Sequence, residues 1–265
     1  MAGNSQNTTY VVLGANKGIG LGLVQALLAR PQTTVVGVVR DPVRASHLEE
    51  QCSSVPKGEG SILHALAVDV SRSPGRDDLK DFIKTKLPSS IGHVDAFISS
   101  IGHTGVMKPA LETTAEEMRD HYEVNTIAPL MLFQAFWPLM EASTESGASS
   151  TPKKVFFLSS SVGCIGDWME PIPGGAYGPS KAALNWIVRK LHFELQDKGI
   201  VSVAVHPGWV QTEMGDMAAK SWNYPGKPPL TVAQSVEGVL GVIDGASREN
   251  SSGKFLSYDG KEVPW

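Results

Sequence analysis

Short apolar runs alternate with longer stretches of helical periodicity, and this alternation predicts the main elements of the fold. Several runs are rich in Val and Ile without polar alternation, as strands buried on both faces of a sheet are. They predict seven strands, at Tyr10–Leu13, Thr34–Val39, Ser61–Val68, Val94–Ser99, Lys154–Ser159, Val201–Val205 and Lys254–Ser257. Helical patterns lie between them, near residues 18–29, 77–87, 114–140, 178–197 and 231–246. Strands that alternate with helices predict an α/β fold with a doubly wound parallel sheet of about seven strands and helices on both faces.

The length of 265 residues fits one large α/β domain over residues 1–265, because such folds often run to ~200–250 residues as one unit. One segment inside it, residues 213–230, is rich in Gly, Pro, Met and Trp and has no clear period. A long irregular segment is often a lid over a substrate site, and an ordinary solvent loop is the alternative. A second irregular stretch, Ala142–Pro152, has the Ser, Thr and Gly content of a surface loop.

The composition argues against several classes of protein. A hydrophobic share of 42% supports a sizeable core, and a net charge of −4 disfavours a surface that binds nucleic acid or an anionic membrane. Cys52 and Cys164 form neither a disulfide framework nor a metal-ligand spacing, which suits a reducing compartment. The first residues lack the apolar core of a signal peptide, and the most apolar stretch, Thr126–Met140, is shorter than the ~20 residues of a membrane span. We therefore expect a cytoplasmic protein with no metal ion, nucleic-acid partner or membrane partner.

Tyr177 and Lys181 are four residues apart in a predicted helix, so their side chains share one face. A phenol titrates near pH ~10 in water and is alone a poor acid or base at neutral pH. A nearby ammonium group favours the phenolate and should lower the phenol's pKa toward the working range. The pair therefore predicts an acid/base device, and a chance pairing on an amphipathic helix is the alternative.

A glycine-rich turn follows the first predicted strand and leads into the first predicted helix. Its spacing is Gly-x-x-x-Gly-x-Gly. Glycines let a backbone turn tightly and approach a pyrophosphate, and a helix N-terminus supplies N–H donors and a favourable dipole. We therefore predict dinucleotide binding, with the phosphates held by Gly14, Asn16, Lys17, Gly18, Ile19 and Gly20.

The end of the second predicted strand bears on the choice between NAD and NADP. A carboxylate there binds the ribose 2′-hydroxyl of NAD, whereas an Arg accommodates the 2′-phosphate of NADP. The strand is followed by Arg40, and Lys17 adds a second cation, so we predict NADP(H). Asp41 is the counter-argument, since a shift of one residue in register would bring its carboxylate to the ribose. Asp69 and Val70, after the third strand, are expected at the adenine ring, and a helix-capping or loop role is the alternative for Asp69.

Together, these motifs resemble the short-chain dehydrogenase/reductase family over nearly the whole chain. The family pattern appears in order as the glycine turn, Asp69, Asn125, a serine cluster, Tyr177 with Lys181, and Pro207–Thr212. The C-terminal half is similar to ketoreductases of the norsolorinic acid reductase type, which act on aromatic polyketides. The resemblance implies a Rossmann-type fold in a single NADP(H)-binding domain, and an oxidoreductase acting on C=O and CH–OH groups.

The resemblance also implies catalytic roles. Tyr177 would be the general acid that protonates the carbonyl oxygen, and Lys181 would lower the pKa of Tyr177 and bind the nicotinamide ribose. Ser160, the match to the family's Ser-x-x-Gly, would hold the carbonyl as an oxyanion-hole donor does, and strand alternation makes the serines on either side structural. Asn125 would hold a water that links Lys181 to solvent. A buried amide that bridges backbone groups is the alternative for Asn125, and both can hold at once.

Further cofactor contacts follow from the same resemblance. Where the family usually has Asn-Asn-Ala-Gly after the fourth strand, this chain has Ser99-Ser100-Ile101-Gly102, so its adenine-side contacts differ. Ser100 and Gly102 are still expected to line the cofactor channel. The residues expected at the nicotinamide carboxamide are Pro207, Gly208, Val210 and Thr212.

The loop between Ser160 and Tyr177 is longer than is usual in the family. Its Trp168 and Met169 are expected to stack against a flat, apolar substrate, and a Trp that only packs the loop onto the core is the alternative. Cys164, in the same loop, is expected to be a small buried residue.

We therefore expect an NADPH-dependent carbonyl reductase for a bulky ketone, aromatic or of the polyketide type. The nearest alternative is an NAD-linked alcohol dehydrogenase. Other classes remain open, namely a non-catalytic NADP(H)-binding sensor or scaffold, or a dehydratase or cyclase that uses Asp167 in the same pocket. The family commonly forms dimers or tetramers through the helices near 114–140 and 178–197, so a homodimer or homotetramer is expected.

Overall fold

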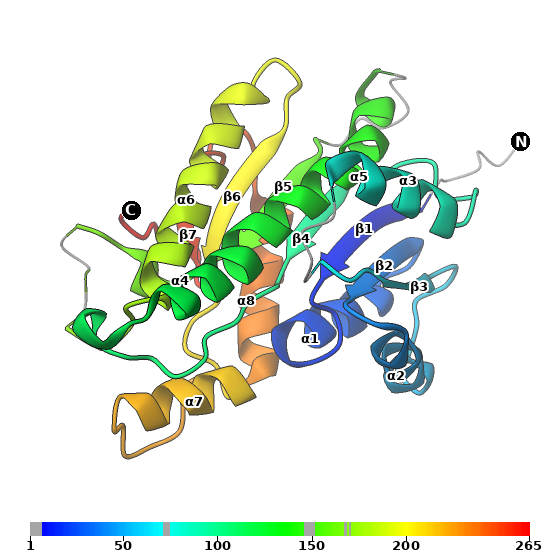
Figure 1. The fold of residues 1–265 in the computed structure, drawn as a ribbon. Helices are drawn as coiled ribbons and strands as arrows, with labels where there is room; N and C mark the ends of the chain where they lie inside the picture. The colour runs from blue at the N-terminus through cyan, green and yellow to red at the C-terminus, as the bar shows by residue number, and fades with distance from the viewer. Residues whose placement is uncertain (1–6, 71–74, 146–151, 167–168, 170) are drawn as a thin grey trace, which may run out of the picture. The chain divides into compact units, whose positions relative to one another are not determined.

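The computed structural model describes residues 7–70, 75–145, 152–166, 169 and 171–265 (Figure 1). Its seven strands form one parallel sheet in the order β3-β2-β1-β4-β5-β6-β7, which extends the Rossmann strand order. The strands are β1 (Thr8–Leu13), β2 (Thr33–Val39), β3 (Ile62–Ala67), β4 (Ala96–Ser99), β5 (Lys154–Leu158), β6 (Val201–His206) and β7 (Phe255–Ser257). All seven predicted strands are confirmed, as is the fold class. The reason is visible in β2, where every residue is buried.

The chain divides into two compact units, which we describe separately. The first comprises the described residues of Met1–Ser100 and Met131–Lys153, and the second those of Ile101–Leu130 and Lys154–Trp265. The first unit contains β1 to β4 with α1 (Gly18–Leu28), α2 (Pro42–Ser53), α3 (Arg76–Lys86) and most of α5 (Ala128–Glu145). The second contains β5 to β7 with α4 (Ala115–Tyr122), α6 (Tyr177–Glu194), α7 (Glu213–Ser221) and α8 (Val232–Gly245).

The first unit buries an ion pair. Lys153 is 2% exposed, and its ammonium group pairs with Oδ1 of Asp95. The other carboxylate oxygen accepts the N–H of Thr9 at 2.7 Å and lies 3.1 Å from Nε2 of His93. Each oxygen of the carboxylate therefore has a partner, which is the condition under which a protein core tolerates a charge.

Three helical expectations need correction. The single helix expected over 114–140 is α4, a π-helical turn at Glu123–Ile127, and then α5, which runs into the stretch expected to be a loop. The helix α2 was not predicted, because only Leu48 and Cys52 of it are buried and they give little apolar period. The segment 213–230 is not wholly irregular, since α7 occupies its first half.

Membrane insertion finds no support in the part of the chain that the structure describes, where no helix is both long enough and apolar enough to span a bilayer. No group of three or more His, Cys, Asp or Glu side chains is arranged there to hold a metal ion either.

Candidate functional site

In the first unit, the glycine turn between β1 and α1 forms a cradle made of backbone. Gly14 and Gly18 have φ angles of +74° and +56°, which residues with a side chain rarely adopt. A Cβ added to Gly20 would lie 2.2 Å from the carbonyl oxygen of Gly14 and 2.6 Å from Oγ of Ser100. Because α1 begins at Gly18, its first N–H groups lie at this turn, and the arrangement fits a pyrophosphate.

The cations predicted at the 2′-phosphate lie on exposed positions of the first unit. Lys17 precedes α1 and Arg40 follows β2. Asp41 caps α2, since its Oδ1 accepts the backbone N–H of Arg44 at 2.9 Å and its Oδ2 pairs with the Arg44 guanidinium. The hydrogen bond from that N–H is the main cause that lowers the pKa of Asp41. The carboxylate thus has a structural task at the helix terminus, which weakens the case for it as a ribose ligand.

Arg44 was not predicted as the partner of Asp41. The pair Asp41-Pro42 is nevertheless a typical start of a helix, and it places Arg44 in the first turn. Ser100 is one of the residues that differ from the family pattern. It donates its N–H to the carbonyl of Leu13 at 3.0 Å, and its hydroxyl lies close to Gly20. Asp69 is exposed just after β3, and Val70 is half-buried beside it.

In the second unit, Ser160 and Tyr177 are brought together by a tight helix contact. Ser160 caps a 3-10 turn at Ser161–Gly163, where its Oγ accepts the N–H of Val162 at 3.2 Å. A Cβ on Gly163 would lie 2.9 Å from Cβ of Lys181, and one on Gly178 would lie 2.8 Å from the carbonyl of Val162. The two glycines therefore let this turn pack against the first turn of α6, and the Ser160 and Tyr177 side chains hydrogen-bond.

Lys181 lies one helical turn after Tyr177 on α6, as the spacing predicted. Its Nζ donates to the carbonyl of Leu158 at 2.9 Å and lies 5.8 Å from the centroid of the Tyr177 ring. Burial lowers the pKa of Lys181 to about 8.

The expected direction of the Tyr177 shift is wrong for this structure. Burial raises the pKa of the Tyr177 phenol to about 12, and the hydrogen bond with Ser160 offsets only part of that effect. The physical reason is desolvation, because a phenol that is 7% exposed loses the water that would stabilise its anion. Lys181 is itself buried and donates to a carbonyl group, so it does not outweigh this effect.

Asn125 is fully buried in the π-helical turn between α4 and α5. Its Oδ1 accepts the N–H of His103 at 2.7 Å, and its Nδ2 donates to the carbonyl of His103 at 2.8 Å and to Oγ of Ser180 at 2.9 Å. The side chain thus bridges the segment after β4 to the start of α6, as the structural alternative anticipated. One lone pair of Oδ1 remains for the expected water.

The segment after β6 carries the residues predicted at the carboxamide. Gly208 has a φ of +82°, and a Cβ there would lie 2.3 Å from Cδ1 of Leu230. Thr212 caps α7, with its Oγ1 accepting the N–H of Gly215 at 3.1 Å. Pro207 is fixed by its carbonyl, which accepts the hydroxyl of Ser235 at 2.7 Å, while Val210 pairs with Leu230 in a β-bridge.

Gly102 lies near Lys181, because a Cβ added there would be 3.8 Å from Nζ of Lys181 and 3.3 Å from Cε of Met214. Asp167 and Trp168 lie outside the described residues. Met169 is 64% exposed. Cys164 is buried, as expected, and its thiol donates to the carbonyl of Pro264 at 3.1 Å.

Apolar side chains surround Tyr177 in the second unit. It packs with Met107 and Ala218 in one buried cluster, against which Val162 and Trp222 also pack. The sequence reasoning missed Met107 and Trp222 as neighbours of the phenol. Trp222 belongs to the segment expected to be a lid, whereas Met107 carries no signal in the sequence that would have found it.

Known proteins resemble this chain over most of its length. The family model for short chain dehydrogenase matches residues 8–222. A norsolorinic acid ketoreductase of Dothistroma septosporum is 36% identical over 99% of this chain and 94% of its own length. One of Aspergillus parasiticus is 33% identical over 99% of this chain and 93% of its own length.

Among solved structures, NADPH-bound carbonyl reductase from chicken fatty liver superposes with a TM-score of 0.80 at 32% identity, covering 98% of this chain and 100% of that one. Family model, relatives and fold agree along nearly the whole sequence. The chain therefore belongs to the short-chain dehydrogenase family and is similar to its ketoreductases and carbonyl reductases.

Proposed function

We propose that the protein is an NADPH-dependent carbonyl reductase that acts on a bulky, apolar ketone of the aromatic or polyketide type. The observation that carries the proposal is the buried phenol of Tyr177, hydrogen-bonded to Ser160 one helical turn from Lys181. The names of the relatives support the substrate class, since two are norsolorinic acid ketoreductases.

The chemistry follows from the groups around the phenol. NADPH, when bound, supplies the hydride. Ser160 and Tyr177 donate hydrogen bonds to the substrate's carbonyl oxygen and orient it. As charge develops on that oxygen, Tyr177 gives up its proton. The transfer is downhill even with a pKa of about 12, because an alkoxide is a stronger base than a phenolate. Lys181, charged below pH 8, stabilises the phenolate that remains.

Two groups of residues would hold the cofactor. In the first unit, the glycine cradle would bind the phosphates, and Arg40 with Lys17 would bind the 2′-phosphate. In the second unit, Lys181 and the segment Pro207–Thr212 would bind the nicotinamide half. We favour NADP(H) over NAD because Asp41, the residue that would select NAD, caps α2.

We also infer that the protein is a homo-oligomer. On α6, Trp186 is 66% exposed and Phe193 is 55% exposed, and large apolar groups that protrude from one helix are typical of interfaces. Light scattering on the purified protein, with Phe193→Arg as the disrupting variant, tests this inference.

The function is tested by NADPH oxidation with purified protein and a panel of aromatic and aliphatic ketones. We expect turnover of fused-ring aromatic ketones, faster with NADPH than with NADH. The reverse assay, with NADP⁺ and the corresponding alcohols, addresses the dehydrogenase alternative. NADPH binding without turnover of any panel member would contradict the proposal and favour a sensor or scaffold.

A further inference from the structure

We propose that Trp222 is a specificity-determining gate over Tyr177, which a flat, aromatic ketone displaces when it enters. The inference rests on the proposed carbonyl reduction and adds which side chain selects the substrate and on what ground. All the residues involved belong to the second unit.

The phenol of Tyr177, the proposed proton donor, is covered by its neighbours. Tyr177 is 7% exposed, with Met107, Ala218, Val162 and Trp222 packed around it. A phenol has to touch the carbonyl oxygen that it protonates. At least one of these four neighbours must therefore move when a ketone binds.

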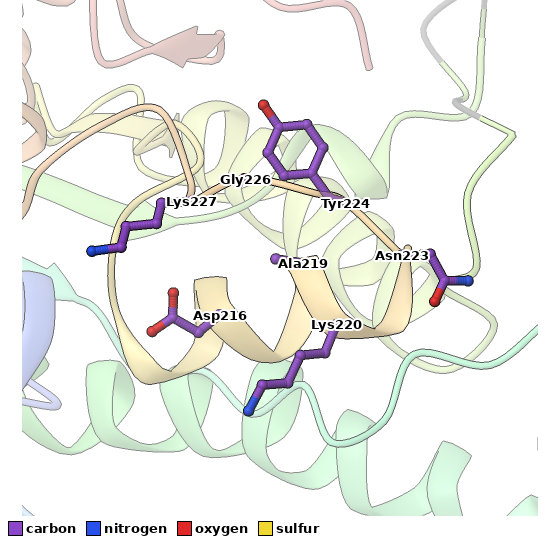
Figure 2. Close-up of a pocket in the computed structure, with 7 residues that line it drawn as sticks. All are labelled: Asp216, Ala219, Lys220, Asn223, Tyr224, Gly226 and Lys227. Atoms are coloured by element: carbon purple, nitrogen blue, oxygen red, sulfur yellow. The ribbon is translucent and has the colours of Figure 1, made fainter.

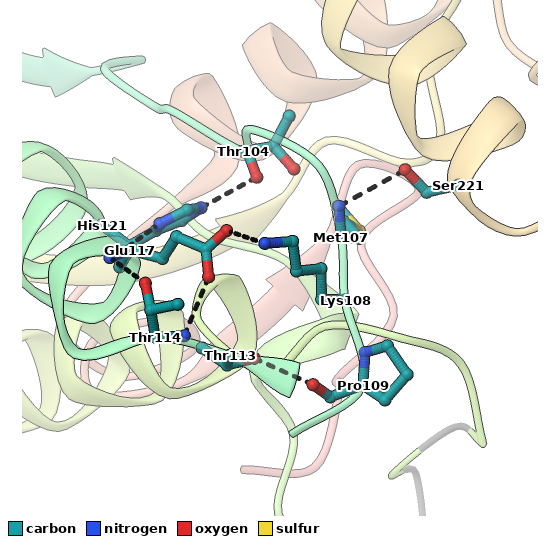
Figure 3. Close-up of polar contacts among 9 residues, drawn as sticks. All are labelled: Thr104, Met107, Lys108, Pro109, Thr113, Thr114, Glu117, His121 and Ser221. Atoms are coloured by element: carbon teal, nitrogen blue, oxygen red, sulfur yellow. Dashed lines mark hydrogen bonds and ion pairs between the residues drawn. The ribbon is translucent and has the colours of Figure 1, made fainter. Parts of the chain in front are cut away.

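The side of the cluster that carries Met107 is firmly anchored (Figure 3). Lys108 pairs with Glu117 of α4, Nζ to Oε1, at 2.6 Å, and its carbonyl accepts the N–H of Gly175 at 3.0 Å. The carbonyl of Thr104 contacts Nε2 of His121 at 2.8 Å. Glu117 is in turn held by the capping box with Thr114. These polar contacts hold the chain on both sides of Met107, so the segment that carries it forms a fixed wall.

Val162 is equally fixed. It lies in the 3-10 turn that packs against the first turn of α6, where a Cβ on Gly178 would already clash with its carbonyl oxygen. A shift of this turn would also move Ser160, the group proposed to hold the carbonyl. Neither Met107 nor Val162 is therefore free to open the cluster at low cost.

On the α7 side of the cluster, the contacts of Trp222 and Ser221 are single hydrogen bonds between neutral groups. Nε1 of Trp222 donates to the carbonyl of Pro173 at 2.9 Å, and Oγ of Ser221 accepts the N–H of Met107 at 3.3 Å (Figure 3). Between described residues, no ion pair is formed by the α7 side chains Asp216 and Lys220. When the Trp222 ring moves, it gives up one neutral hydrogen bond, to Pro173, and its packing against the cluster and against Trp209.

The surface that the Trp222 ring covers indicates the class of substrate. The indole of Trp222 packs edge to face against Trp209, with centroids 5.3 Å apart, and Trp209 is held by its own Nε1–H bond to the carbonyl of Gly215 at 3.1 Å. When Trp222 swings away, Met107 and Val162 are uncovered beside the phenol, and Trp209 is uncovered where the Trp222 ring lay. A thioether, an aliphatic group and an indole are surfaces on which an aromatic ring system packs well.

The opposite face of α7 does not compete for such a ligand. A hollow of ≈ 590 Å³ beside it is lined by Asp216, Ala219, Lys220, Asn223, Tyr224, Gly226 and Lys227 (Figure 2). Asp216 and Lys220 share one face of the helix, whereas Ala218 lies on the other, as does Trp222 at its end. The charged side chains of the hollow do not suit an apolar ketone, so the selective contact belongs to the Trp222 face.

The test compares Trp222→Ala and Trp222→Phe with the wild type and with the control Trp137→Phe, whose tryptophan is half-buried on α5 in the first unit. kcat and KM are measured with NADPH for 2-acetylnaphthalene and for cyclohexanone. We expect Trp222→Ala to lower KM for the naphthyl ketone and to raise it for cyclohexanone, so that the ratio of kcat/KM values changes by about tenfold or more. Trp222→Phe should move the ratio the same way by less, and the control should not move it.

A wild type that reduces ketones, with Trp222 variants that keep its substrate ratio, overturns the gate and leaves the proposed function standing. A wild type that reduces neither these ketones nor others of the panel overturns the proposed function, and the gate with it. Should Trp222→Ala fail to fold, as judged by circular dichroism, the ratio for Trp222→Phe decides.

Discussion

Each of the two units buries a lysine, and the two lysines are treated in opposite ways. Lys153 and Lys181 are both 2% exposed. Lys153 is paired with the Asp95 carboxylate, which is itself hydrogen-bonded to Thr9. Lys181 donates to the carbonyl of Leu158, and it has no carboxylate partner among the described residues.

We interpret the difference as one between a structural charge at Lys153 and the functional charge proposed for Lys181. A buried ion pair holds two segments together by the attraction between its two partners. A buried ammonium without a counter-ion is costly, and burial brings the pKa of Lys181 down to about 8. Buried groups with a shifted pKa are often found at functional sites. Lys181 fits this pattern, because it lies beside the phenol of Tyr177.

The largest expected effect is on the free energy of unfolding, and it tests the contrast between Lys153 and Lys181. Lys153→Met should lower the free energy of unfolding by about 3–5 kcal/mol, because it leaves the buried Asp95 carboxylate without its cation. Lys181→Met should leave that free energy unchanged or raise it, since it removes a desolvated charge, while it should abolish ketone reduction. Urea unfolding of both variants measures the contrast. Equal destabilisation would mean that the two lysines have the same structural role.

The dependence of stability and kcat on the protonation of Lys181 is a second test of its contrast with Lys153. Burial lowers its pKa from 10.5 to about 8. Between these values the unfolded chain still binds the proton and the folded protein has released it, so this group makes stability rise with pH. Over the same window the ammonium is lost beside Tyr177, so kcat for reduction should fall as pH rises above about 8. The control is Lys181→Met, which should lack this rise in stability. A flat kcat profile to pH 10 in the wild type would contradict the assignment.

These two lysines also show what sequence can and cannot predict. The strands and the glycine turn were predictable, because buried parallel strands are apolar throughout and a cradle with positive φ requires glycine. The spacing of Tyr177 and Lys181 was equally informative. The direction of the Tyr177 pKa was not, because it depends on burial by residues far away in sequence, such as Met107 and Ala218.

The short helices α2 and α7 were not predicted, for a related reason. The helix α2 has only two buried residues and is specified chiefly by its cap, Asp41 followed by Pro42. Within 213–230, the glycine and alanines of α7 hide its period, although Thr212 starts it in a regular way. Apolar periodicity in the sequence predicts helices that bury many side chains in the core. Helices that bury few have to be predicted from their capping residues.

A smaller effect is expected at Arg40, an exposed cation of the first unit. Arg40→Asp should shift the preference between NADPH and NADH toward NADH by about tenfold, which corresponds to ~1.4 kcal/mol. The reason is the loss of a guanidinium for the 2′-phosphate. KM values for both cofactors measure the shift, with the exposed Lys80→Asp on α3 as a control for net charge. An unchanged preference would remove Arg40 from the cofactor site.

The central claim is that the proton comes from the buried phenol. It is tested most directly by steady-state ketone reduction with Tyr177→Phe beside Tyr122→Phe, a control on α4. The account predicts that Tyr177→Phe binds NADPH as the wild type does and turns over ~10²–10⁴-fold more slowly, while the control is unaffected. Turnover by Tyr177→Phe close to that of the wild type would contradict it.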